Sequence, residues 1–151
     1  MKREQLLERL DGGWRGLAEA YAGLSEAEMT RPGVVGEWSV KDVLAHVTTW
    51  EDEALKYLPA IAAGERTPRY RAMYGGIDAF NAQMEASKRE LSLAEVLRRL
   101  ESTHARLLEY VRGVPEEQFA TDTRFRRRLR WDTWHHFGEH AAAMRGWRGR
   151  D

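Results

Sequence analysis

The stretch LERLDGGWRGLAEAYAGL, residues 7–24, repeats large apolar side chains at alternating steps of three and four residues. This spacing places them along one face of an α-helix, which is the pattern of a helix packed in a bundle. Gly12 and Gly13 interrupt good helix formers and should weaken the helix locally. The pattern continues through them, so we expect one helix over residues 2–24 with this seam: Leu7, Leu10, Trp14, Leu17, Tyr21 and Leu24.

Three more long helices and one further helical region are indicated along the chain. Ser39 with Asp42 resembles a capping box and predicts a helix over residues 40–62. A helical region starts near Ile77, and Ser92 begins a fresh helix that Gly113 ends. The last helix covers residues 132–147, and no strand pattern of any length is present. The sequence therefore predicts a single all-α domain, residues 1–151, folded as a four-helix bundle.

Two connecting segments bear on function. Residues 63–76 look like a long loop, which is either a lid over a site or a simple crossover between helices. The basic run from Arg124 to Arg130 looks irregular. It could bind phosphates, but in a neutral protein such a run is more often a solvated connector.

Composition excludes several classes of protein. Lys plus Arg and Asp plus Glu number 24 each, so the formal net charge is zero and a dedicated nucleic-acid binder is not expected. Cysteine is absent, which excludes a disulfide scaffold and thiolate chemistry by the chain itself. No apolar run resembles a signal peptide or a membrane span, so we expect a soluble, cytoplasmic protein without a membrane partner.

The histidines carry the strongest chemical signal. His136 and His140 are four residues apart, so a helix stacks them on one face, whereas His135 points about 100° away. His46 lies on the edge of the apolar stripe of the second helix and reaches the pair if the two helices are neighbours. Three neutral imidazoles would suit Zn²⁺, Ni²⁺ or Fe²⁺. His104 sits alone on an apolar face, where a hydrogen-bonded core histidine is the commoner outcome.

Three carboxylates near this histidine set are candidates for a supporting role. Asp42, Glu53 and Glu139 could each orient a ligand ring or act as a general base. Glu53 lies two turns from His46, roughly 10 Å by helix rise, and is not expected to reach the same ion.

The stretch from Gly33 to His46, followed by Trp50-Glu51, resembles the second-helix signature of the DinB-like four-helix bundle superfamily. The stretch from His136 to His140 resembles its last helix, and the similarity is closest to ClbS/DfsB-like members. The resemblance implies an up-up-down-down bundle with a long crossover. It also implies a divalent metal held by His46, His136 and His140, and a homodimer.

Relatives of this kind include thiol-dependent transferases and a hydrolase that opens a strained ring. The resemblance therefore implies a metal-dependent hydrolase, or a transferase that uses a low-molecular-weight thiol, acting on a small-molecule substrate. We expect Trp38, Trp50, Tyr70 and Tyr74 to wall the substrate pocket. The alternative is a non-catalytic protein that binds or sequesters a small molecule and retains a vestigial histidine cluster.

Overall fold

The computed structural model describes residues 1–150, and these residues form helices joined by turns and loops. The only bridge between extended residues in this range is an isolated one between Val35 and Trp38. The predicted all-α fold is therefore confirmed. The helices are α1 (Arg3–Tyr21), α2 (Glu26–Thr30), α3 (Val40–Ala62), α4 (Tyr70–Tyr74), α5 (Ile77–Lys88), α6 (Leu93–Gly113), the 3₁₀ turn η1 (Glu116–Gln118), α7 (Arg124–Asp132) and α8 (Trp134–Arg148).

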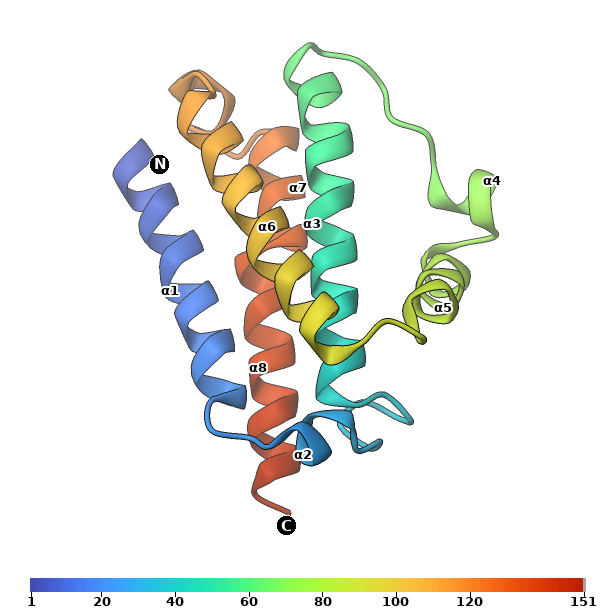
Figure 1. Ribbon diagram of the computed structural model, residues 1–151. Helices are drawn as coiled ribbons and strands as arrows, with labels where there is room; N and C mark the ends of the chain where they lie inside the picture. Colours follow the sequence, from blue (N-terminus) through green and yellow to red (C-terminus); the bar gives the residue numbers. More distant parts are fainter. Residues whose placement is uncertain (151) are drawn as a thin grey trace.

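Long helices α1, α3, α6 and the α7–α8 pair lie side by side as a bundle (Figure 1). At one end, the Arg3 guanidinium of α1 donates to the carbonyl of Val111 near the end of α6, at 3.1 Å. At the other end, Arg148 of α8 donates to the carbonyl of Ala20 near the end of α1, at 3.0 Å. Helices α1 and α8 therefore run in one direction, and α3 and α6 run in the other (Figure 1).

The helix directions expected from the resemblance, up-up-down-down, are wrong. The order is up-down-down-up, because an up-up-down-down bundle needs two long crossovers and this chain has one. That crossover spans the chain between α3 and α6 and carries α4 and α5 (Figure 1). The connections from α1 to α3 and from α6 to α7 are shorter, and they reverse the chain direction.

Helix starts follow the predicted capping signals. The Ser39 hydroxyl accepts the backbone N–H of Asp42 at 3.2 Å, and the Asp42 carboxylate accepts the backbone N–H of Ser39 at 3.0 Å. The Ser92 hydroxyl likewise accepts the N–H of Glu95 at 3.1 Å. Each cap satisfies donors that the first turn of a helix leaves free.

The basic run is a helix, so the prediction of an irregular connector was wrong. Phe125 and Leu129 stand four residues apart, and both are buried in the core. Their apolar stripe is narrow and flanked by five arginines, so the helical period is weak in the sequence. Thr133, with φ −127° and ψ −105°, breaks the helix between α7 and α8.

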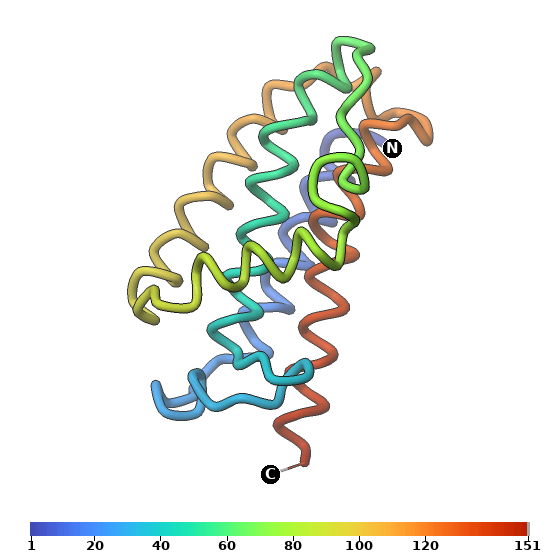
Figure 2. Tube along the Cα trace, turned by 90° about the vertical axis from the view of Figure 1, so that its right-hand side faces the viewer, coloured from blue at the N-terminus to red at the C-terminus, as the bar shows by residue number. Residues whose placement is uncertain are grey.

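The crossover segment packs over one side of the bundle. Helix α5 runs obliquely across α3 (Figure 2). Phe80 of α5 is buried, and its ring contacts those of Trp50 and Tyr70. None of the helices in residues 1–150 combines the length and the apolar character that crossing a bilayer requires.

A buried polar pair links α3 to α6 in the core. The Nδ1 atom of His104 lies 2.8 Å from Oε2 of Glu51, and the two side chains are 6% and 0% exposed. The indole of Trp14 stacks on the imidazole with ring centroids 3.6 Å apart. Burial raises the pKa of Glu51, and the hydrogen bond with His104 opposes that rise. His104 is therefore the hydrogen-bonded core histidine that the sequence favoured.

The sequence contained a signal for this pair. Glu51 is four residues after Val47 and three before Ala54, so it occupies a position of the buried stripe of α3. A charged side chain at such a position needs a buried partner. A histidine on the apolar face of α6 is that partner.

The approach of α1 to α8 depends on Gly13. A methyl group at this position would lie 3.2 Å from Cβ of Trp134 and 3.2 Å from Cδ2 of Phe137, whereas one at Gly12 would meet nothing within 4 Å. We expect Gly12→Ala to raise the free energy of unfolding by up to about 1 kcal/mol through helix propensity. Gly13→Ala should lack this gain, because its methyl group must displace α8. Urea unfolding of both variants measures the difference, and equal stabilisation would contradict close packing at Gly13.

Removing one member of the buried pair should cost more than removing both. His104→Leu or Glu51→Leu leaves a buried polar partner unpaired, which typically costs about 3–5 kcal/mol. The double variant replaces the pair by apolar groups and should be more stable than either single variant. Chemical denaturation of the four proteins gives the coupling between the two side chains. Losses that simply add would show that the pair is not a unit.

Candidate metal centre

The three predicted ligands come together between α3 and α8. His46 lies in the second turn of α3, while His136 and His140 lie in the first two turns of α8. Nε2 of His136 is 2.9 Å from Nε2 of His46 and 2.9 Å from Nε2 of His140. One nitrogen from each ring falls within 4.8 Å of the others, so the three histidines could hold a metal ion.

Hydrogen bonding alone does not satisfy this arrangement. A neutral imidazole has one N–H donor and one acceptor nitrogen, so Nε2 of His136 is either a donor or an acceptor. It makes one well-formed hydrogen bond, yet two other ring nitrogens stand at contact distance. A cation that receives a lone pair from each ring removes the conflict. Two nitrogens bound to one ion at ~2.0–2.1 Å lie roughly 3 Å apart, which fits the observed separations.

The environment keeps these rings neutral, which is the form that binds metal. Burial and the neighbouring ring of His140 lower the pKa of His46 to about 3. The same causes lower the pKa of His136 to about 2. Burial also lowers the pKa of His140, although the charge of Glu139 opposes the shift.

Within the part of the chain that the structure describes, the ring of His136 makes polar contacts through Nε2 only. Its Nδ1 atom is buried and has no hydrogen-bond partner among residues 1–150. In a ligand bound through Nε2, this nitrogen carries the proton, which usually finds a carbonyl or carboxylate. The ring is therefore positioned by packing, with its neighbour Phe137 fully buried at the interface with α1.

Trp38 borders the centre. Its indole lies 4.9 Å from the ring of His46, measured between centroids. The backbone N–H of Trp38 donates to the backbone carbonyl of Val35 at 2.9 Å, and this bond closes a tight turn before α3. Gly36 sits in this turn at φ +55°, a conformation that favours glycine.

The other expected pocket residues form a packed aromatic cluster. Trp50 lies one turn beyond His46 on α3, and its ring centroid is 5.3 Å from that of Tyr70. Tyr70 and Tyr74 have centroids 6.2 Å apart, and both contact the buried ring of Phe80. The structure thus brings Trp50, Tyr70 and Tyr74 together and places Trp38 separately, against His46.

A polar network that we did not anticipate ties the crossover to the bundle. The Tyr70 hydroxyl donates to Oε1 of Glu53 at 3.0 Å and accepts from the Arg128 guanidinium at 2.7 Å. Arg128 also binds the carboxylate of Asp132 at 2.6 Å. Burial raises the pKa of Asp132 to about 6, although Arg128 opposes the shift. Three helices, α3, α4 and α7, are joined by this network.

Of the remaining candidate residues, His135 and Glu139 lie outside the histidine cluster, whereas Asp42 lies beside it. Nε2 of His135 lies 3.1 Å from the carboxylate of Glu139, and the His135 ring contacts that of Trp131. His135 therefore lies outside the histidine cluster, as predicted. Glu139 is largely exposed and turned to His135 rather than to the centre. Asp42, in contrast, shares with His46 the lining of a cavity of about 10 Å³. That space is enough for about one water molecule.

Comparison with known proteins gives a family match. A model of the DinB superfamily matches residues 9–146. No curated protein matches the chain in sequence. The structure, in turn, resembles several solved ones.

An uncharacterised protein from Escherichia coli UTI89 is 14% identical, with 99% of this chain and 94% of that chain covered and a TM-score of 0.81. A structure titled "Sibling Lethal Factor Precursor - DfsB" is 16% identical, with 99% and 96% covered and a TM-score of 0.82. The colibactin self-resistance protein ClbS, solved in complex with a dsDNA, is 12% identical, with 95% and 93% covered and a TM-score of 0.79. At such identities the likeness shows the fold, and the family match confirms the resemblance seen in the sequence: the chain belongs to the DinB superfamily.

Proposed function

We propose that this protein is a divalent-metal-dependent enzyme, a hydrolase or a transferase, that acts on a small molecule. The metal would be held by Nε2 of His46, His136 and His140. The observation that carries the proposal is the contact of three neutral ring nitrogens that hydrogen bonding alone leaves in conflict. Zn²⁺, Ni²⁺ and Fe²⁺ all accept imidazole ligands.

A divalent ion at this position would lower the pKa of a bound water, or of a thiol on an incoming cofactor. The chain contains no cysteine, so a sulfur nucleophile must come from a separate thiol cofactor. A homodimer and a cytoplasmic location remain predictions from the sequence.

The residues of the chain orient the ligands and supply a carboxylate beside them. His136 and His140 are fixed on successive turns of one helix, and Trp38 limits the rotation of the His46 ring. Of the three carboxylates considered, Asp42 is the one that lines the cavity beside His46. We infer that Asp42 is a candidate proton acceptor there, together with Glu85 of α5, whose carboxylate lines the same cavity and pairs with Arg89.

Elemental analysis of protein purified without added metal tests the centre. We expect about one divalent ion per chain in the wild-type protein, because three imidazoles bind such ions tightly. His46→Ala and His136→Ala should lose the ion. His135→Ala is the matched control, since it removes a histidine of the same helix that contacts Glu139 instead, and it should keep the ion.

Turnover by the metal-loaded protein is then measured with a panel of low-molecular-weight thiols and hydrolysable substrates. Activity that follows metal content across these variants supports the enzyme. Absence of metal from every preparation would contradict the proposal and favour a sequestration protein with a vestigial histidine cluster.

A second candidate, binding of duplex DNA, has one structural feature in its favour. A groove of about 420 Å³ is lined by Arg9, Arg126, Arg127 and Arg130, with Asp122 as its one carboxylate. Arg130 also stacks on Trp131, a side chain that is 55% exposed. The structural neighbour ClbS was solved in complex with a dsDNA.

This candidate predicts binding that weakens steeply with salt. The logarithm of the DNA-binding constant falls linearly with the logarithm of the salt concentration, and each phosphate contact adds about 0.9 to the magnitude of this slope. Replacing three arginines should therefore lower that magnitude by about 2.7. The measurement compares wild type with the triple glutamine variant of Arg9, Arg127 and Arg130. A control variant replaces three exposed cations elsewhere: Lys56, Arg66 and Arg112. Equal slopes in the two variants would eliminate the groove as a DNA site.

A further inference from the structure

Lys88 is a partly buried cation without a direct ion-pair partner in residues 1–150, although the charges of Asp52 and Glu53 act on it at longer range. It lies in the last turn of α5, and its ammonium donates to Oγ1 of Thr49 on α3 at 2.5 Å. The Thr49 hydroxyl, itself 4% exposed, donates in turn to the carbonyl of Ala45 at 3.0 Å. No carboxylate of residues 1–150 lies within ion-pair distance of Lys88. A neutral hydroxyl compensates a desolvated charge poorly, so this ammonium favours an anionic ligand.

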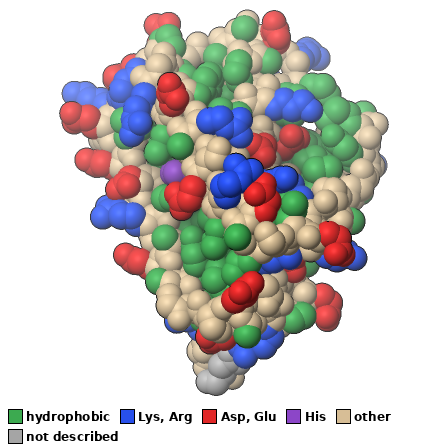
Figure 3. Space-filling model, in the orientation of Figure 1, with side chains coloured by type: hydrophobic (Ala, Val, Ile, Leu, Met, Phe, Trp, Pro, Cys, Tyr) green, Lys and Arg blue, Asp and Glu red, His purple; other side chains and the backbone are tan. Residues whose placement is uncertain are grey.

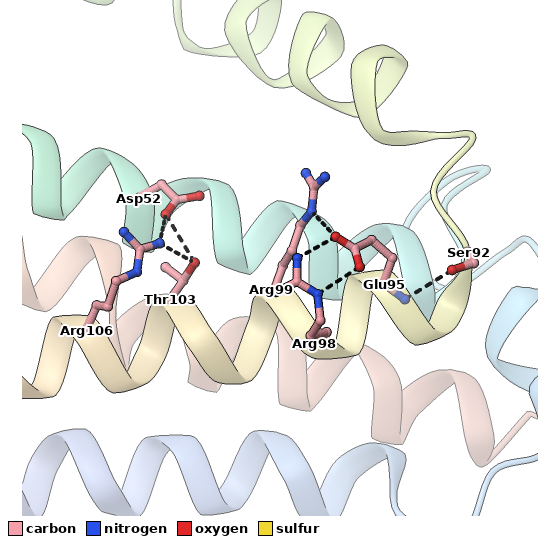
Figure 4. Close-up of polar contacts among 7 residues, drawn as sticks. All are labelled: Asp52, Ser92, Glu95, Arg98, Arg99, Thr103 and Arg106. Atoms are coloured by element: carbon pink, nitrogen blue, oxygen red, sulfur yellow. Dashed lines mark hydrogen bonds and ion pairs between the residues drawn. The ribbon is translucent and has the colours of Figure 1, made fainter.

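Lys88 forms part of a basic pocket between α3, α5 and α6. The pocket measures about 290 Å³ and is lined by Lys88, Arg98, Arg99, Arg106, Thr103 and Asp52. Arg106 contacts Asp52 at 3.4 Å and the Thr103 hydroxyl at 3.1 Å (Figure 4). This volume accommodates a small anionic group with part of the molecule that carries it.

Arg99 brings unused donors to the pocket. Its Nε donates to Oε1 of Glu95 at 2.9 Å, while Arg98 binds both oxygens of the same carboxylate. The two terminal nitrogens of Arg99 point away from Glu95 (Figure 4) and have no partner among residues 1–150. Guanidinium nitrogens presented in this way match the geometry of phosphate and carboxylate oxygens.

The pocket has an excess of positive charge. Four cations, Lys88, Arg98, Arg99 and Arg106, stand against three carboxylates: Asp52 in the lining, Glu95 behind it and Glu53, which acts on Lys88 from α3. This leaves a surplus of one positive charge. The chain as a whole is neutral, and on the face in Figure 3 the two signs of charge alternate. A local surplus of this size in a concave site attracts anions.

The basic pocket adjoins the histidine cluster. Lys88 lines not only this pocket but also the small cavity beside His46, together with Thr49 and Asp42. The lysine side chain is therefore a shared wall between the two spaces. An anion bound on the outer side of Lys88 would be held one side chain away from the proposed metal centre.

We propose that Lys88 and Arg99, supported by Arg106, form a binding site for the compact anionic group of a small-molecule ligand, a phosphate or a dicarboxylate. We also propose that this ligand is the substrate or the thiol cofactor of the metal centre, and this part rests on the proposed function. The anion site itself stands without it, because its donors belong to α5 and α6 and not to the histidines.

Isothermal titration with inorganic phosphate, at fixed ionic strength and on chelator-treated protein, tests the site. The wild-type protein should bind one phosphate. Lys88→Gln and Arg99→Gln should each weaken binding about tenfold, since each removes charged hydrogen-bond donors. Lys88→Arg should retain most of the affinity. Lys56→Gln is the matched control, because it removes one exposed lysine from α3, and it should change affinity less than about twofold.

Succinate replaces phosphate in a second titration and distinguishes the two ligand classes. The same titrations on His136→Ala separate the two proposals. Phosphate binding that persists in this variant and still depends on Lys88 supports the anion site even if the protein binds no metal. Absence of binding to both anions, or equal affinity in Lys88→Gln, Arg99→Gln and Lys56→Gln, would overturn the anion site and leave the metal centre untouched.

Discussion

The contact of three neutral imidazole nitrogens between α3 and α8 is the constraint on which the rest of the structure depends. Nε2 of His136 faces two other ring nitrogens at 2.9 Å, and it has only one proton or one lone pair to offer them. Burial prevents the rings from resolving the conflict by becoming charged. Such a cluster persists only if two helices are held firmly together, or if a cation lies among the nitrogens.

The scaffold provides that rigidity at several points. Gly13 lets α1 approach α8 closely on the side that carries Trp134 and Phe137, and the pair of Glu51 with His104 joins α3 to α6 in the core. The single long crossover sets the helix directions and also covers α3 with α4 and α5. As a result, Tyr70 and Lys88 arrive near the site from a segment that is distant in sequence. One connection thereby determines both the topology and the surroundings of the centre.

Much of this could be predicted from local patterns, because helical periodicity and capping residues report local structure. The all-α fold, the Ser39 and Ser92 caps, the shared face of His136 and His140 and the exclusion of His135 all follow from spacing along the chain. The approach of His46 to that pair also required α3 and α8 to be neighbours, which spacing alone does not give. Helix directions are not encoded in periodicity; they depend on how many long connections the chain has. The partners of Lys88 and Tyr70 lie on other helices, so no spacing in the sequence could reveal them. The pair of Arg128 with Asp132 is different, because its members are four residues apart on α7.

Anomalous diffraction at the absorption edge of the co-purified metal is the most direct measurement of the central claim. The account predicts one peak among the three Nε2 atoms, ~2.0–2.1 Å from each. A peak elsewhere, for example at Glu53 and Asp132, would contradict it. So would a crystal structure in which the ring of His46 turns away from those of His136 and His140.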